Sequence, residues 1–272
     1  MIDLTHRRFG HCCKWIPEGN LTEQNKKIVY ANTNTRTTTI TSLKKLSKSE
    51  AEGKIANIIT HNFQALSSHL NEIMRNKPKE LKMVRLGSDI LPGYTEPFAN
   101  ELYKNLMAFI ELEFRKIGQF ARKHNIRLSF HPGQFTQLNS SNSDILSKSI
   151  VDFEYHAMMA EFMGYGSTPY SHGFEINIHG GGKQHGLDIL INTIKNKLSP
   201  TARNLISIEN DEFSFGLDDL LVLEKHCAIL LDVHHHWIHD EEYIQPNDAR
   251  LDIILNSWKG IRPELHFALS HE

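Results

Sequence analysis

Side chains that can bind a metal ion stand at the ends of successive short apolar segments. A histidine ends segment 126–131, another ends 174–179, and a glutamate ends 205–209. A single histidine in such a place is usually structural, but so many in phase with successive segments are hard to reach by chance. Imidazole and carboxylate groups without thiolates suit Zn²⁺, Mn²⁺ or Fe²⁺. The series consists of Asp89, His131, His179, Glu209, Asp232 and His266, with His234, His235 and His236 directly after Asp232.

The number of candidate ligands indicates more than one ion. Three histidines with two or more acids exceed what a single tetrahedral ion needs, so we expect two or three divalent ions. Paired ions are the usual arrangement for phosphodiester hydrolysis, with a carboxylate bridging them. Glu209, central in the series, is the expected bridge. The expected catalytic residues are His131, His179, Glu209, Asp232 and His266.

The apolar segments alternate with helical patterns. Ser47 and Glu50 form a capping box before a helix that ends near residue 78, and a long helix covers about 102–121. Strands are predicted at 8–12, 83–87, 126–131, 174–179, 205–209, 228–232 and 264–268. Further helices are predicted near 143–165, 185–198, 216–226 and 247–259. Residues 13–46 remain one long irregular stretch, which is either functional or mobile.

This alternation predicts parallel βαβ units, and seven or eight units favour a closed (β/α) barrel over an open sheet. In such a barrel the carboxyl ends of all strands lie on one face, so the metal-binding residues from Asp89 to His266 are expected to meet there. A length of 272 residues suits a single domain of this kind. No Gly-x-Gly-x-x-Gly follows the first strand and no Walker loop occurs.

Composition excludes several other classes of protein. Hydrophobic residues make up 40% and charged residues 23%, as in an ordinary globular chain. Three cysteines, two of them adjacent, build neither a disulfide framework nor a thiolate zinc site. No secretory signal and no run of 18 apolar residues occurs, which predicts no membrane partner and an intracellular protein. We expect it in the cytoplasm, acting at the nucleoid, or in a host cell if it is a viral product.

Charge is unevenly distributed along the chain. Residues 1–48 hold nine Lys or Arg, Lys44 and Lys45 among them, against three acids, whereas the whole chain has a net charge of −2. A basic segment on an acidic body is what a phosphate-contacting rim beside a cation site would look like. Judged by charge alone, residues 1–48 could equally be a solvent-exposed loop without a role in phosphate binding.

Several short motifs of the sequence resemble those of the UV damage endonuclease family, in order and in spacing. They are His131–Phe135, Asn177–Gly182, Ile208–Glu212, Leu231–His236 and Leu265–Ser270, and Arg85–Asp89 with Leu91 and Pro92 is similar to the family's second-strand motif. The resemblance runs from about residue 8 to the end. It implies a TIM-like barrel related to endonuclease IV and the xylose isomerases, and two or three metal ions, often manganese, with zinc as the alternative. It also implies incision immediately 5′ of cyclobutane dimers and 6-4 photoproducts in double-stranded DNA, leaving a 3′-hydroxyl.

Carried over by position, the resemblance implies that the metal ligands are His131, His179, Glu209, Asp232, His235 and His266, to which Asp89 and Glu264 are added as candidates. Strand alternation alone would favour His234 and His236 over His235. Gln134 and Phe135 match a Gln-Tyr pair that resembles a wedge probing the duplex, and an aromatic ring can stack on a displaced base. The expected lesion- and DNA-binding residues are Gln134, Phe135, His11, Lys44 and Lys45.

The sequence departs from the family pattern at three places. His11 stands where the family often has Tyr, and Glu264 where it has a Lys that can be carbamylated. The sequence stops at Glu272, directly after the seventh predicted strand. We therefore expect a single domain over 1–272, a barrel truncated after the seventh strand that lacks the family's final βα units and their metal-binding Glu. A complete barrel would be expected to be monomeric.

Three alternative functions remain open from the residues. An apurinic-site nuclease of the endonuclease IV type would share metals and barrel, and a sugar isomerase of the xylose isomerase class would share the cation-loaded barrel. The isomerase has no need of a basic rim or of the loop with Gln134 and Phe135. An inactive, truncated barrel is favoured by the missing units.

Overall fold

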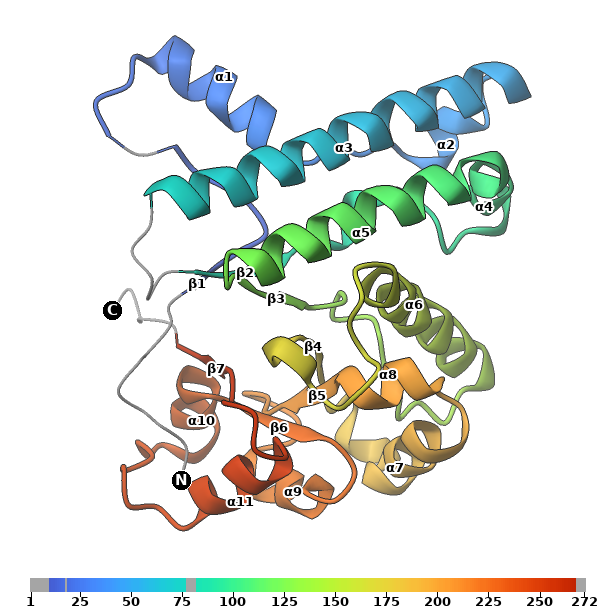
Figure 1. Cartoon of the computed structure of the whole chain (residues 1–272). Helices are drawn as coiled ribbons and strands as arrows, with labels where there is room; N and C mark the ends of the chain where they lie inside the picture. Colours follow the sequence, from blue (N-terminus) through green and yellow to red (C-terminus); the bar gives the residue numbers. More distant parts are fainter. Residues whose placement is uncertain (1–9, 18, 77–81, 268–272) are drawn as a thin grey trace. The chain divides into compact units, whose positions relative to one another are not determined.

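The computed structural model describes residues 10–17, 19–76 and 82–267. These residues form two compact units (Figure 1). The N-terminal unit holds the described residues up to 128 together with 162–164, and the C-terminal unit holds the others. The strands follow one another in the order of the chain, from β1 to β7.

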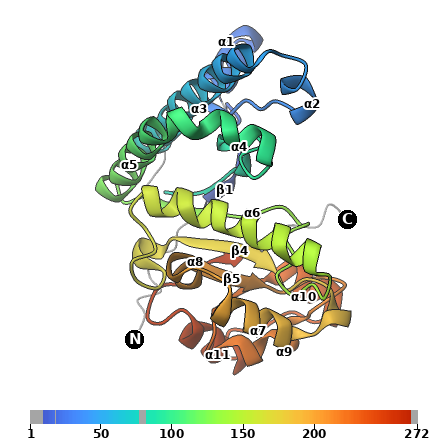
Figure 2. The same ribbon diagram turned by 90° about the vertical axis from the view of Figure 1, so that its right-hand side faces the viewer.

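The N-terminal unit combines two parallel strands with long helices. β1 (Gly10–Cys12) pairs with β2 (Met83–Leu86). Helix α3 runs over Lys48–Asn76 and α5 over Met107–Lys123, and Figure 2 shows the two side by side. The Phe63 ring of α3 meets Phe114 of α5 edge-on, 4.9 Å between centroids. The remaining helices are α1 (Glu23–Thr33), α2 (Ile40–Leu43), η2 (Ser88–Ile90), α4 (Pro97–Tyr103) and η3 (Lys104–Leu106).

The predicted capping box at the start of α3 is confirmed. Ser47 donates its backbone N–H and its hydroxyl to Glu50 Oε2, at 2.9 and 2.6 Å, and the N–H of Glu50 donates to Ser47 Oγ at 3.4 Å. The reciprocal bonds satisfy backbone groups that a helix start otherwise leaves unpaired.

The prediction that residues 13–46 form one irregular stretch is wrong, because α1 and α2 lie within it. Thr22 and Thr39 cap these helices by accepting the N–H groups of Asn25 and Ser42. Of the α1 residues only Thr33 is buried, so the helix carries no amphipathic pattern that periodicity could reveal. Tertiary contacts hold the segment instead: the Asn62 amide of α3 bonds both backbone groups of Arg36.

The C-terminal unit takes up the chain within β3 (Arg127–Phe130) and continues the parallel pairing. β3 pairs with β4, β4 with β5, β5 with β6 and β6 with β7. The other strands are β4 (Glu175–His179), β5 (Ile206–Glu209), β6 (Ala228–Asp232) and β7 (Leu265–His266). The helices are α6 (Ser143–Phe162), η4 (Ser171–Gly173), η5 (Lys183–His185), α7 (Leu187–Asn196), α8 (Pro200–Leu205), α9 (Leu217–Leu220), η6 (Leu221–Leu223), α10 (Val233–Asp240) and α11 (Arg250–Ser257).

Two short helices of this unit escaped prediction. Ser199 caps α8 and Pro200 stands in its first turn, which moves the start of β5 to Ile206. Helix α10 begins directly after β6, with Asp232 as its cap.

Residues 8, 9, 77, 78 and 268 of the predicted elements lie outside the described residues. Nowhere in the described ranges is a helix both long and apolar enough to span a membrane.

Candidate metal centre

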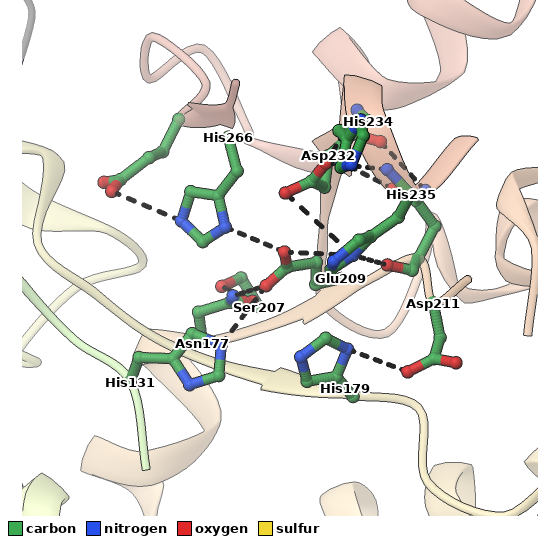
Figure 3. Close-up of polar contacts among 12 residues, drawn as sticks. His131, Asn177, His179, Ser207, Glu209, Asp211, Asp232, His234, His235 and His266 are labelled. Atoms are coloured by element: carbon green, nitrogen blue, oxygen red, sulfur yellow. Dashed lines mark hydrogen bonds and ion pairs between the residues drawn. The ribbon is translucent and has the colours of Figure 1, made fainter. Parts of the chain in front are cut away.

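The carboxylate of Glu209 is the centre of a cluster of histidines (Figure 3). This side chain ends β5 and is buried. His266 Nδ1 lies 2.8 Å from Glu209 Oε1, and His131 Nε2 lies 3.3 Å from Oε2. His235 Nδ1 is 3.6 Å from Oε1. The Asn177 amide also donates a hydrogen bond to Oε2.

Glu209 belongs to two groups of residues that could each hold a metal ion. In one group the potential ligand atoms of His131, His179 and Glu209 all lie within 4.8 Å of one another. In the other, those of Glu209, Asp232 and His235 do so. A carboxylate common to two such groups has the connectivity of a bridge between two ions.

Strand register brings these residues together. In the parallel pairing of β4 with β5, His179 lies opposite Glu209, and in that of β6 with β7, Asp232 lies opposite His266. Parallel strands all end at the same edge, so residues distant in sequence converge there.

The structure distinguishes among the three consecutive histidines. Strand β6 ends at Asp232, whose Oδ1 accepts the N–H groups of His234 and His235, at 2.8 and 2.9 Å, and so caps α10. Because a helix begins at this point, strand alternation no longer decides which side chain points inward. His235 joins the group around Glu209, whereas His236 is buried with its Nδ1 2.8 Å from Asp240 Oδ2.

The electrostatics of the cluster fit a divalent cation. Burial favours the protonated form of Glu209, yet hydrogen bonds from His131 and His266 and the nearby imidazole charges hold the pKa of this carboxyl well below its usual range. Burial lowers the pKa of His179, although the negative charge of Glu209 opposes that shift. Metal binding requires an ionised carboxylate and deprotonated imidazole nitrogens, and the lowered pKa values of Glu209 and His179 favour both. Nitrogen and oxygen donors without thiolate suit Mn²⁺ or Zn²⁺.

Sequence reasoning assigned no role to a set of asparagines and acids around the cluster. The Asn210 side chain donates to the carbonyl of Asp232 at 3.0 Å and accepts its N–H at 2.8 Å. The Asn210 carbonyl lies 3.0 Å from His235 Nδ1. Asp211 Oδ2 lies 3.2 Å from His179 Nδ1. The signal that could have revealed part of this set is strand alternation, since Asn177 stands two residues before His179.

Several predicted site residues lie elsewhere or at the margin of the cluster. Asp89 lies in the N-terminal unit, where its Oδ1 accepts the hydroxyl of Thr35 at 2.9 Å, and it is in neither ligand group. Glu264 is buried, 4.0 Å from His266 Nε2, and accepts the Ser129 hydroxyl at 3.3 Å. For both, the role of metal ligand stays a prediction.

The predicted DNA-binding residues are divided between the two units. His11 Nε2 lies 2.7 Å from His69 Nε2, and Lys44 Nζ lies 5.6 Å from the centre of the Phe98 ring. These two residues and Lys45 belong to the N-terminal unit. Gln134 and Phe135, on the loop after β3 in the C-terminal unit, are both exposed.

Comparison with known proteins gives concordant matches. The model of the family described as UV-endonuclease UvdE matches residues 8–271. A UV DNA damage endonuclease of Bacillus cereus (strain G9842) is 31% identical over 242 residues, which cover 86% of this chain and 72% of that protein. A putative UV-damage endonuclease of Acanthamoeba polyphaga mimivirus is 31% identical over 203 residues, 72% of this chain and 60% of that protein.

A solved structure extends the comparison to the fold. The crystal structure of SacUVDE superposes with a TM-score of 0.76 at 23% identity, covering 98% of this chain and 82% of that chain. The α/β fold with an incomplete TIM-like barrel is therefore confirmed, and the described residues hold seven parallel strands against the eight of a closed barrel. The expectation of one domain over 1–272 stays a prediction.

Proposed function

This chain belongs to the UV-endonuclease UvdE family, and on that premise we propose that it cuts double-stranded DNA immediately 5′ of UV photoproducts. Membership makes it a UV DNA damage endonuclease, a DNA repair nuclease. The proposal adds the position of the cut and the substrates, which are cyclobutane dimers and 6-4 photoproducts. Hydrolysis breaks the bond between phosphorus and the 3′ oxygen, so the product carries a 3′-hydroxyl.

The sharing of Glu209 between two ligand groups is the observation that carries this proposal. Two or three divalent ions, manganese or alternatively zinc, would be held by His131, His179, Glu209, Asp232, His235 and His266. When bound, such ions supply a hydroxide nucleophile at neutral pH and stabilise charge on the leaving oxygen.

The protein's own groups prepare the site for this chemistry. His131 and His266 keep Glu209 ionised although it is buried. The Asn177 amide bonds Oε2 and restrains rotation of the carboxylate. Because these donors are already oriented in the folded protein, little reorganisation is needed when charge develops at the reacting phosphate.

The proposed contacts to DNA are of two kinds, contacts to the lesion and contacts to the phosphate backbone. Gln134 and Phe135 probe the duplex at the lesion, where an aromatic side chain can enter an opened base step. Lys44 and Lys45 contact phosphates, and His11 is the second lesion-contacting residue. We further propose that the protein acts inside the cell, in the cytoplasm at the nucleoid or in the host cell of a virus, and that a form with a complete barrel is a monomer.

The alternatives make different predictions for substrate. An apurinic-site nuclease would cut abasic duplex in preference to UV-irradiated duplex, and a sugar isomerase would convert aldoses. An inactive barrel would cut neither duplex. The family match favours the UV-damage endonuclease over the first two, and the incision assay distinguishes it from an inactive barrel.

The test is incision of a 5′-labelled duplex with one cyclobutane thymine dimer, compared with undamaged duplex, abasic duplex and an aldose. We expect a cut directly 5′ of the dimer that EDTA abolishes and added Mn²⁺ restores. Glu209→Gln should lower the incision rate by about 10²- to 10³-fold, as removal of a group that stabilises developing charge does. The matched control is Glu161→Gln, on the exposed side of α6, which should retain full activity. Full activity of Glu209→Gln, or a preference for the abasic duplex, would contradict the proposal.

A further inference from the structure

A second highly exposed aromatic side chain lies on a loop beside the candidate metal centre. Phe213 follows β5 and is 84% exposed, as much as Phe135, which follows β3 and is 83% exposed. A single exposed apolar residue is ordinary on a protein surface. Phe213 differs from such residues because it lies beside the candidate metal centre on a loop that hydrogen bonds hold in place.

The loop that carries Phe213 is fixed by hydrogen bonds to the side chain and the backbone of Asp211. Asp211 Oδ1 accepts the N–H groups of Phe213 and Ser214, at 2.8 and 2.9 Å. The N–H of Asp211 donates to the carbonyl of Phe215 at 2.8 Å, which closes the loop. Because this backbone is ordered in advance, little loop entropy would be lost when Phe213 contacts a ligand.

Neighbouring segments anchor the base of the loop. The hydroxyl of Ser214 donates to the carbonyl of Gly181 at 2.6 Å. Phe215 is buried so close to Gly180 that a Cβ there would lie 2.8 Å from its ring. Phe215 is therefore buried in the protein, whereas Phe213, two residues before it, is exposed to solvent.

The same loop contacts the candidate metal centre. Asp211, which holds the backbone of Phe213, lies 3.2 Å from His179, a member of the ligand group with Glu209 (Figure 3). A phosphodiester that reaches Glu209 must lie over the strand ends, where the loops after β3, β4 and β5 project. Phe213 is thus fixed to the side of the cluster from which the DNA must approach.

We propose that Phe213 is a DNA-contacting residue that packs against the duplex away from the lesion. Adjacent parallel strands lie about 4.8 Å apart, so the loops after β3 and β5 start about 10 Å apart. That separation equals about three base-pair steps at 3.4 Å each. Since Phe135 is assigned to the lesion, Phe213 meets an undamaged step of the same duplex. The inference rests on the proposed function, because it takes duplex DNA as the ligand.

A lesion-independent contact has a defined kinetic signature. A ring that contacts the duplex away from the reacting phosphate contributes the same binding to the ground state and to the transition state. Its removal should raise KM for incision and leave kcat unchanged. Affinity for damaged and undamaged duplex should fall by the same factor, about tenfold, because a large apolar side chain that leaves water on contact contributes to binding of either duplex.

The experiment measures binding and incision separately. Binding of fluorescein-labelled duplex, with and without one thymine dimer, is measured by anisotropy in a Glu209→Gln background so that no substrate is consumed. Incision by Phe213→Ala is measured in the otherwise unchanged chain. Phe213→Trp should retain affinity, because it keeps the aromatic face.

The matched control is Val222→Ala. Val222 is 62% exposed and lies in η6, which precedes β6 and so stands at the opposite edge of the strands from the metal centre. It should bind and cut like the unchanged chain. Thermal unfolding of Phe213→Ala should be unaltered, since the side chain is exposed.

Equal loss of affinity for both duplexes with unchanged kcat supports the proposal. Unchanged affinity for both duplexes overturns it, and a loss confined to the damaged duplex overturns the assignment of Phe213 to an undamaged step. Failure of the unchanged chain to cut the dimer-containing duplex would instead contradict the proposed function, while the binding comparison would still test Phe213.

Discussion

At the scale of single residues, Asn210 connects two candidate ligands that come from different elements. Its side chain bonds both backbone groups of Asp232, and its carbonyl lies against the ring of His235. Groups that orient metal ligands in this way typically contribute 10- to 100-fold to metal affinity.

Asn210→Asp should therefore weaken Mn²⁺ binding by about tenfold or more, because the new carboxylate oxygen faces the carbonyl of Asp232 where the amide had donated. Free Mn²⁺ is measured by electron paramagnetic resonance during titration of the apoprotein. Asn196→Asp, on the exposed side of α7, is the control with the same change of charge. Wild-type affinity in a folded Asn210→Asp variant would show that this residue does not position the ligands.

For Phe135, unlike Phe213, we expect a loss of affinity that depends on the lesion. Phe135→Ala should weaken binding to dimer-containing duplex more than to undamaged duplex, because an inserted ring gains contacts only where a base step is opened. Anisotropy titrations with both duplexes measure the ratio of the two losses. Equal losses would mean that Phe135 does not discriminate the lesion.

At the scale of elements, α3 carries a buried histidine that links the stability of the N-terminal unit to pH. Burial, and to a smaller extent the charge of His11 2.7 Å away, lower the pKa of His69 to about 3. In the unfolded chain the same group titrates near 6.5. Between these values the unfolded state binds the extra proton, so this contribution to stability is complete above about pH 6.5 and declines as pH falls towards 3.

His69→Phe keeps a ring in the buried position and removes the titration. We expect its unfolding temperature to fall less than that of the unchanged chain between pH 7 and pH 4.5. Calorimetry at several pH values gives the comparison. A variant with the slope of the unchanged chain would show that protonation of His69 does not control acid stability.

At the scale of the whole molecule, the metal cluster should couple ion binding to stability. Its candidate ligands come from β4, β5, β6 and β7, from α10 and from His131, the residue directly after β3, so bound ions would cross-link elements that the unfolded chain separates. An ion that binds only the folded state at a hundred times its Kd contributes about 2.7 kcal/mol.

Chelation of the metal-loaded protein should accordingly lower the unfolding temperature by about 5 to 10 °C, which scanning calorimetry with EDTA and with Mn²⁺ measures. The Glu209→Gln variant should show a smaller difference between the two conditions. Identical unfolding temperatures with and without chelator would contradict a structural contribution from the ions.

The order of residue types along the chain was enough to predict the fold class and the outline of the site. Apolar segments alternating with helical patterns predicted parallel strands, and polar residues at the ends of those segments predicted where ligands converge. Both inferences depend on short-range periodicity and on one rule, that parallel strands end at a common edge. For that reason His131, His179, Glu209, Asp232 and His266 could be selected from the sequence alone.

Features that depend on contacts between distant segments could be recognised only in the folded chain. The family resemblance already favoured His235 over His234 and His236, but the physical reason, that β6 ends and Asp232 caps a helix there, is found only in the structure. The polar helix α1 has no pattern of its own and is recognised only in its packed context. Likewise, Phe213 and Phe215 are the same residue type two positions apart, and only the packing of Phe215 against Gly180 determines which is buried and which is displayed. The local sequence determines the secondary-structure propensity and the hydrophobic periodicity of a segment. Which side chains are buried, and which residues they contact, depends on segments that folding brings from elsewhere in the chain.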